Sequence, residues 1–366
     1  MKRLLLVIFA PMLCVLFCMA SELTNLKVNR MLEPEGIVRM GQFSWQIISD
    51  DNNVHQIAYH IKVASTEEGL KGGPTLMWDS ERRESSDMVQ VFYQGRRFPY
   101  SSTVYWRLEV WLSNDEYLQS DIQRIQTGRK GSVWNGTPVT KADEQHDYFY
   151  YLRWLNTLLM NQSDSGELFD PVPDDENAIP VSRAAAVLYS LYREEGDIKA
   201  LYDYYNMVKR WMMFQCQKDS TVSRQLIGMM SEMAQRQNLQ ADILEYNRIK
   251  GDSTVYEPYW LYVDEPKWND GSIRQTSSSI AYSRVEISIP SKQDNGDITH
   301  ECPYGTISTK WSKEESGAIS WEIELPVGVQ ANVLFPEGFA DDEGLRSKVL
   351  GSGYWLLRIV PVVGGN

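Results

Sequence analysis

The chain has 366 residues, 43% of them hydrophobic and 23% charged, and its net charge is −13. This length corresponds to two or three domains of roughly 100–200 residues each. The acidic balance, without clustered lysines and arginines, argues against a nucleic-acid partner, because phosphate binding needs such clusters. The 12 tryptophans and 20 tyrosines are typical both of β-sandwiches and of surfaces that contact carbohydrate.

Residues 1–20 have the pattern of a signal peptide. Lys2 and Arg3 are basic, residues 4–17 are apolar, and residues 18–20 fit a cleavage site. A membrane anchor is the alternative, but the apolar run is shorter than a bilayer span requires. A lipid-modified Cys18 is disfavoured, because Phe17 precedes it where a small residue is expected. We therefore predict export to the periplasm or the extracellular space, with no membrane span in the mature chain.

Beyond that segment the chain has two cysteines, Cys216 and Cys302. They fall in different predicted domains, so a disulfide and two free buried thiols both remain open. The sequence has no Cys/His cluster, and we predict neither a metal site nor a cofactor. The acidic runs at 174–176 and 341–343 offer oxygen ligands for calcium, but solvated loops are the preferred interpretation.

Residues 22–128 alternate between apolar and polar positions. The alternation is clearest at 43–47, 58–63 and 104–111, and clusters of turn-forming residues separate these runs. Roughly seven short strands in about a hundred residues predict an immunoglobulin-like or fibronectin-like β-sandwich. A glycine-rich and proline-containing linker follows.

Residues 138–252 change to a helical period. Thr140 and Asp143 resemble a capping box, and an apolar stripe begins at Tyr148. Further helices are predicted over 184–192, 201–212, 224–236 and 240–250. The region therefore holds four or five helices, fewer than a full α/α toroid needs. Its methionine and aromatic stripes are assigned to the core.

Residues 253–366 return to strands, with alternation most regular from about residue 279. Strands are predicted over 284–289, 306–311, 319–325, 331–335 and 354–359. The predicted fold is thus multidomain, with an N-terminal β-sandwich, a truncated helical middle and a C-terminal β-sandwich.

Residues 251–260 join the helical and C-terminal regions and place Glu257 among Tyr256, Tyr259 and Trp260. Aromatic faces that stack on a sugar ring, together with a carboxylate that activates water, are what a glycosidase site requires. The structural alternative is a strand that buries the aromatic residues and leaves Glu257 in solvent. Composition by itself favours that alternative.

Several segments together resemble the bacterial α-L-rhamnosidases, a family of inverting glycoside hydrolases with a six-hairpin (α/α) barrel. The likeness covers most of the chain beyond residue 20 and lies in the segments 43–45, 56–65, 78–80, 105–111, 151–168, 192–211, 303–307 and 331–336. Residues 251–257 resemble the motif that carries the general base. The resemblance implies that Glu257 is the general base, that Tyr256, Tyr259 and Trp260 bind substrate, and that the substrate is a rhamnosyl glycan.

The chain also departs from the family pattern. The acidic motif that supplies the general acid has no counterpart, and Arg183 stands where the family has an aspartate. Inversion needs two carboxyl groups, and the spacing of Asp143, Glu144 and Asp170 favours none of them as the second. Three hypotheses follow: a hydrolase that acts on rhamnose-containing glycans, a non-catalytic glycan-binding or scaffolding relative, and a remnant whose aromatic residues form core.

Overall fold

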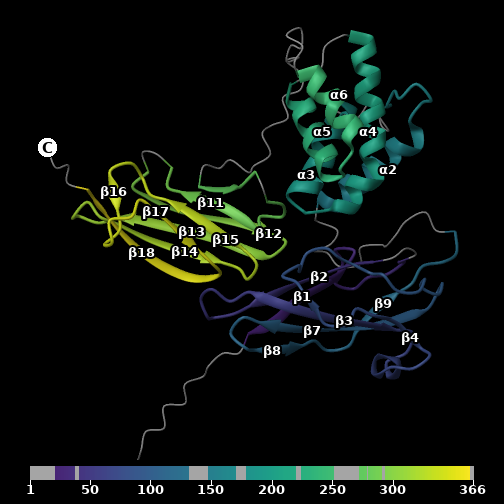
Figure 1. Cartoon of the computed structure of the whole chain (residues 1–366), viewed down its shortest axis with the longest axis horizontal. Helices are drawn as coiled ribbons and strands as arrows, with labels where there is room; N and C mark the ends of the chain where they lie inside the picture. The colour runs from purple at the N-terminus through teal and green to yellow at the C-terminus, as the bar shows by residue number, and fades with distance from the viewer. Residues whose placement is uncertain are drawn as a thin grey trace, which may run out of the picture.

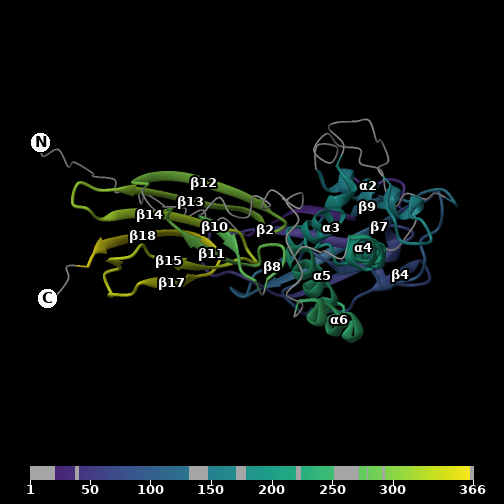
Figure 2. The same ribbon diagram turned by 90° about the horizontal axis from the view of Figure 1, so that it is seen from above.

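A computed structural model of the protein describes residues 21–37, 41–131, 147–169, 179–219, 224–250, 272–277, 279–290 and 293–362. It consists of an N-terminal β domain, a helical bundle and a C-terminal β domain (Figure 1). The bundle lies against the N-terminal domain, and the C-terminal domain extends to one side of both, as the view from above shows (Figure 2). Three hydrophobic clusters, one in each part, form the core.

The N-terminal domain is a sandwich of a three-stranded sheet, β1-β2-β6, and a six-stranded sheet built on β3 and β7. Its strands are β1 Glu22–Val28, β2 Gln42–Ile48, β3 Gln56–Ala64, β4 Leu76–Asp79, β5 Arg83–Glu84, β6 Val91–Phe92, β7 Thr103–Leu112, β8 Tyr117–Gln119 and β9 Gln123–Gln126. A short 3-10 helix, η1 Glu68–Lys71, follows β3. Alternate side chains of β7 are buried, because successive strand residues face opposite sides of a sheet. Phe43 and Trp106 meet across the core at 4.7 Å between ring centroids.

The helical bundle contains α2 Asp147–Asn161, η2 Val181–Arg183, α3 Ala184–Arg193, α4 Ile198–Asp219, α5 Arg224–Arg236 and α6 Gln240–Lys250. Helix α3 is its central element, since all but one of its residues are buried. The run Ala184, Ala185 and Ala186 has small side chains, which let neighbouring helices approach closely. Among the described residues, no helix is both long and apolar enough to cross a bilayer.

The C-terminal domain pairs a four-stranded sheet, β10-β11-β15-β17, with a five-stranded sheet, β12-β13-β14-β18-β16. Its strands are β10 Ile273–Gln275, β11 Arg284–Ser288, β12 Asn295–Cys302, β13 Gly305–Lys313, β14 Ile319–Leu325, β15 Gln330–Leu334, β16 Phe339–Ala340, β17 Ser347–Leu350 and β18 Gly353–Pro361. The buried pair Trp311 and Trp321 stands in register on β13 and β14. The sequence therefore predicted the three-part architecture correctly.

Four described strands of the C-terminal domain, β10, β12, β16 and β17, were not predicted from the sequence, and β12 is the longest of them. It begins Asn295-Gly296-Asp297, residue types that favour turns. Gly296 pairs with Trp311 on β13, and a Cβ atom at Gly296 would lie 2.1 Å from the Trp311 ring. The glycine thus leaves room for the indole that fills this end of the core.

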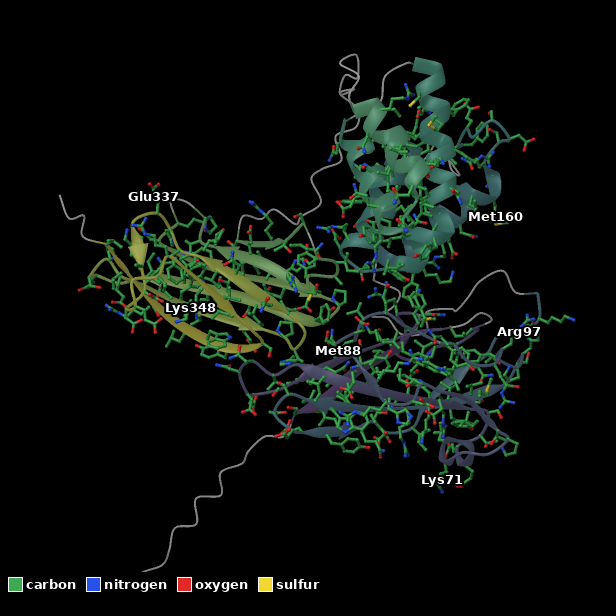
Figure 3. All side chains as sticks on the ribbon, viewed as in Figure 1. Lys71, Met88, Arg97, Met160, Glu337 and Lys348 are labelled. Carbon is green, nitrogen blue, oxygen red and sulfur yellow. The ribbon has the colours of Figure 1, made fainter. Side chains whose placement is uncertain are left out.

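The two β domains are joined by buried contacts. Val327 of the C-terminal domain belongs to the hydrophobic cluster of the N-terminal sandwich, and the Tyr304 ring packs against that cluster. A second junction lies at two turns, where the Asn53 N–H donates to the Ser352 carbonyl (2.7 Å) and the Ser352 hydroxyl donates to the Val54 carbonyl (2.5 Å). Figure 3 labels Met88 at the place where the two β domains meet. Apolar contacts and hydrogen bonds thus link the two β domains at two places.

On the outer face of the six-stranded sheet, His60 lies between two carboxylates. Its Nε2 is 2.6 Å from Asp79 Oδ1 and its Nδ1 is 3.0 Å from Glu109 Oε2. Burial would raise the pKa of Asp79, but the hydrogen bonds from His60 and the Glu81 N–H, with the nearby Lys62 charge, lower it below the usual value.

We expect Asp79→Asn to lower the free energy of unfolding at neutral pH by at most about 1 kcal/mol, because the Asp79 side chain is a third exposed. A depressed folded-state pKa stabilises the protein above the unfolded pKa of about 4, and that contribution is lost as pH falls through the folded pKa. The difference between the variant and the wild type should therefore shrink below about pH 4, which urea unfolding at several pH values measures. A difference that stays constant down to about pH 3 would contradict the role of Asp79.

Candidate functional site

The residues that the sequence singled out for catalysis and sugar binding, Glu257, Tyr256, Tyr259 and Trp260, lie outside the described residues. The same holds for the three alternative acids, Asp143, Glu144 and Asp170, and for Thr140 of the capping box. Arg183 is described: it is exposed and ends η2, directly before α3. The described residues instead contain a cleft that the sequence did not predict.

The cleft lies between the two β domains and has a volume of about 780 Å³. One wall is the outer face of β1 and β2, and the opposite wall is formed by the β12–β13 hairpin and the ends of β14 and β18. The start of α2 and the turn between α3 and α4 complete it. The volume falls within the range of small-molecule sites, roughly 300–1,000 Å³.

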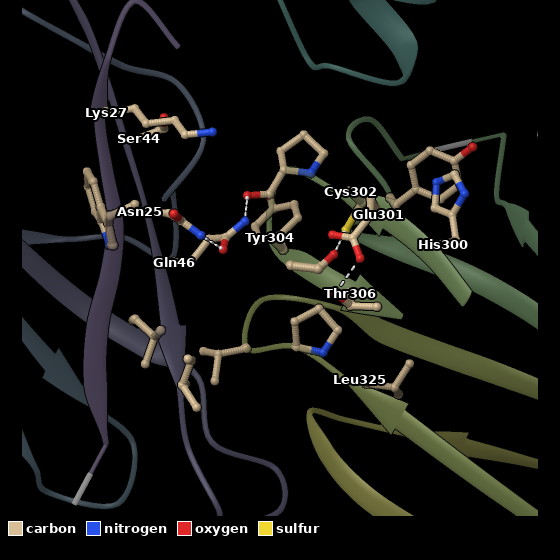
Figure 4. A pocket seen from close by; sticks show the side chains of 18 of the residues that line it. Asn25, Lys27, Ser44, Gln46, His300, Glu301, Cys302, Tyr304, Thr306 and Leu325 are labelled. Carbon is tan, nitrogen blue, oxygen red and sulfur yellow. Dashed lines mark hydrogen bonds between the residues drawn. The ribbon is translucent and has the colours of Figure 1, made fainter. Parts of the chain in front are cut away.

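The N-terminal wall is shaped by an irregularity in β1. The register between β1 and β2 shifts between Thr24 and Lys27, and Asn25 there has a left-handed φ of 47°. Such a bulge turns a side chain out of the ladder. The Asn25 amide donates to Gln46 Oε1 (2.6 Å), and Gln46 Nε2 donates across the cleft to the Pro303 carbonyl (3.1 Å), as Figure 4 shows.

The C-terminal wall carries hydroxyl, carboxylate and aromatic groups. The Thr306 hydroxyl donates to Glu301 Oε1 (2.6 Å, Figure 4), and the Tyr354 hydroxyl donates to Glu322 Oε2 (3.1 Å). Burial raises the pKa of Tyr304 and that of the Cys302 thiol to about 12, so both stay protonated at neutral pH. Cys302 and Cys216 are both free thiols, which excludes the disulfide, although Cys302 is buried and Cys216 only half-buried.

The helical side of the cleft is held by Arg30. Its guanidinium pairs with the Glu195 carboxylate (3.4 Å), donates to the Glu195 carbonyl, and lies 5.5 Å from the centre of the Tyr148 ring. The Tyr148 hydroxyl donates to Asp197 (2.7 Å), which also caps α4 by accepting from the Ala200 N–H. Burial, followed by the Asp197 charge, raises the pKa of Tyr148. These groups attach the bundle to the N-terminal sandwich.

The buried or half-buried carboxylates described in the bundle have structural partners. Glu232 accepts from the Tyr189 hydroxyl (2.6 Å) and pairs with Arg193 (3.2 Å). Asp242 accepts from the Tyr205 hydroxyl (2.8 Å) and from Lys209 (2.5 Å). Carboxylates held in this way stabilise the bundle and are poor general acids.

No group of three or more potential metal ligands of the His, Cys, Asp and Glu types occurs in the part of the chain that the structure describes. The cleft offers amides and hydroxyls that donate and accept hydrogen bonds, and carboxylates that accept them, beside aromatic rings. Its lining comes from segments far apart in sequence, such as Gln46 and Pro303. The hairpin sequence Pro303-Tyr304-Gly305 was the one local signal available.

Two family descriptions match this chain. Residues 23–130 match the "Rha78A-like, N-terminal immunoglobulin domain", and residues 282–349 match the "Bacterial alpha-L-rhamnosidase C-terminal domain". These ranges correspond to the two β domains described above.

Proteins similar to this chain in sequence are named alpha-L-rhamnosidases. An alpha-L-rhamnosidase of Alteromonas sp. (strain LOR) is 38% identical over 127 residues, which is 33% of this chain and 14% of that protein. One from Formosa agariphila is 32% identical over 123 residues, covering 33% of this chain and 13% of that protein. The match thus spans about a seventh of these relatives' length.

Among solved structures, the alpha-L-rhamnosidase of Dictyoglumus thermophilum is similar over 92% of this chain and 99% of that chain, with a TM-score of 0.70 and 8% identity. At this identity the likeness concerns the fold alone. The chain is therefore similar to the α-L-rhamnosidases in both of its β domains, and a small helical bundle stands between these domains in the sequence.

Proposed function

We propose that this protein recognises rhamnose-containing glycans. The observation that carries the proposal is that both β domains of the α-L-rhamnosidases are present and are joined by buried contacts around a polar cleft. The similar proteins are named alpha-L-rhamnosidases, which supports rhamnose as the recognised sugar. A cleft of about 780 Å³ is large enough for a sugar unit. Export through residues 1–20 would bring the protein to glycans outside the cytoplasm.

Hydrolysis is the first form of this function. Glu257 would deprotonate the attacking water, and Tyr256, Tyr259 and Trp260 would stack against the sugar. An inverting hydrolase also needs a carboxylic acid that protonates the leaving oxygen, roughly 6.5–9.5 Å from the base. The resemblance at residues 251–257 supports Glu257 in the first role.

Glycan binding without hydrolysis is the second form. It is favoured by the partners of the bundle carboxylates, since Asp197, Glu232 and Asp242 are each held by tyrosine hydroxyls and, in two cases, by a cation. A protein of this kind would present the two β domains as a glycan-binding or scaffolding unit.

Release of the aryl group from an aryl α-L-rhamnoside separates the two forms. We expect hydrolysis, if Glu257 is the base, to occur in the wild type and to be lost in Glu257→Gln. Inactivity of both proteins, together with measurable binding of methyl α-L-rhamnoside, would establish the binding form. If the wild type neither hydrolyses the aryl rhamnoside nor binds methyl α-L-rhamnoside, the proposed function is overturned.

A further inference from the structure

We propose that the cleft between the two β domains is a binding site for one neutral sugar unit, contacted by Asn25, Gln46, Glu301, Thr306 and Tyr354. The inference rests on the proposed recognition of glycans and adds a location for it. None of these five residues belongs to the stretch 251–260 that the sequence singled out.

The polar groups of the cleft suit hydroxyls, which donate and accept hydrogen bonds at once. Asn25 is exposed and uses one amide N–H on Gln46, which leaves its second N–H and its oxygen for a ligand. Glu301 is exposed and accepts from Thr306 through Oε1, and a carboxylate has about four acceptor sites on two oxygens. A ring hydroxyl between the two walls can therefore donate to Glu301 and accept from Asn25.

Apolar surface lies beside these polar groups. Tyr354 and Ile48 line the cleft and are 52% and 57% exposed, although both are large and hydrophobic. An aromatic ring with one polar end is suited to packing against the C–H face of a sugar. The methyl group of a 6-deoxy sugar would find a similar contact at Ile48.

The charges around the cleft disfavour an anion. Lys27 and Arg30 contribute positive charge, and Asp50, Glu194, Glu195, Glu301 and Glu324 contribute negative charge. Arg30 and Glu195 pair with each other. The remaining negative balance repels an anion, whereas carboxylates accept hydrogen bonds from the hydroxyls of a neutral sugar.

The cleft is built before any ligand arrives. The bulge of β1 fixes Asn25, the Gln46 bond to Pro303 spans the walls, and Gly353 and Tyr354 lie at the turn junction that joins the domains. The Asn52 amide donates to the Tyr354 carbonyl (2.9 Å), so the backbone below the Tyr354 ring is held by the other domain. Such preorganisation reduces the entropy that binding costs.

The test is isothermal titration of the purified chain with methyl α-L-rhamnoside and with a panel of neutral oligosaccharides. The variants are Tyr354→Ala and Glu301→Ala, which remove exposed side chains outside the cores. We expect each to weaken binding at least roughly tenfold, as the loss of a stacking contact or a charged hydrogen bond does. The matched controls lie outside the cleft lining. Tyr117→Ala removes a tyrosine that is similarly exposed, at 49%, on β8 of the N-terminal domain, and Glu337→Ala removes an exposed loop carboxylate.

The outcomes separate this inference from the proposed function. Rhamnoside binding that both cleft variants retain in full would overturn the cleft as the site and leave the function intact. Binding of another neutral glycan, lost in the cleft variants but not in the controls, would support the cleft and overturn rhamnose as the recognised sugar. Failure of the wild type to bind any neutral glycan would overturn both.

Discussion

Replacing Arg193 by methionine is expected to lower the free energy of unfolding by about 3–4 kcal/mol. Arg193 ends α3, and its side chain is 6% exposed. Its guanidinium donates to the carbonyls of Thr276, Ser277 and Ser279 in the C-terminal domain, at 2.6–3.0 Å, and pairs with Glu232 of α5. The substitution would leave the Ser277 and Ser279 carbonyls without this donor and Glu232 without its cation, and each such loss is costly away from water. The Thr276 carbonyl would keep the Ser279 N–H as a donor.

Two further variants make this result specific. Arg193→Lys keeps the charge but lacks the planar fork that reaches several carbonyls, so we expect it to recover only part of the loss. Arg274→Met removes an exposed arginine on the neighbouring strand β10 and should change stability by less than about 0.5 kcal/mol. Urea unfolding of the full chain measures all three. Equal stability of Arg193→Met and Arg274→Met would show that the buried guanidinium contributes nothing.

Gly353→Ala should destabilise the protein by about 2–4 kcal/mol and disturb the junction of the two β domains. Gly353 has a φ of +108°, and a Cβ atom there would lie 2.1 Å from Asn52 Oδ1 and 2.8 Å from Asn52 Cα. The amide oxygen can rotate away, but the Cα atom belongs to the backbone of the other domain. The turns at residues 52–54 and 351–354 would therefore have to separate.

Gly338→Ala is the matched control. Gly338 also has a positive φ, +83°, but its Cβ atom would have no atom within 4 Å. It should show the conformational cost alone, about 1–2 kcal/mol. Small-angle X-ray scattering should detect a larger radius of gyration in Gly353→Ala only. If both variants kept the wild-type radius, the turn junction would not be what fixes the domains relative to each other.

The sequence predicted several elements to the residue, because these elements are held by their own periodicity. Helices α5 and α6 and strand β14 cover the predicted ranges 224–236, 240–250 and 319–325. In each case the apolar period meets a clear stop, such as Gly251 after α6. Strand β12 went unpredicted, because its exposed and turn-like residues are ordered by Trp311 on the neighbouring strand.

The sequence by itself determined the class of the protein: two β-sandwiches around a small helical region, with motifs of the α-L-rhamnosidases. Local period and motif order suffice for that, since each depends on residues close together in the chain. Only the tertiary structure decided that Cys216 and Cys302 are free, that Arg193 crosses between domains, and that Gln46 meets Pro303 in a cleft. The Arg193 and Gln46 contacts join residues more than 80 positions apart in the sequence. No local pattern records which distant surfaces will bury each other.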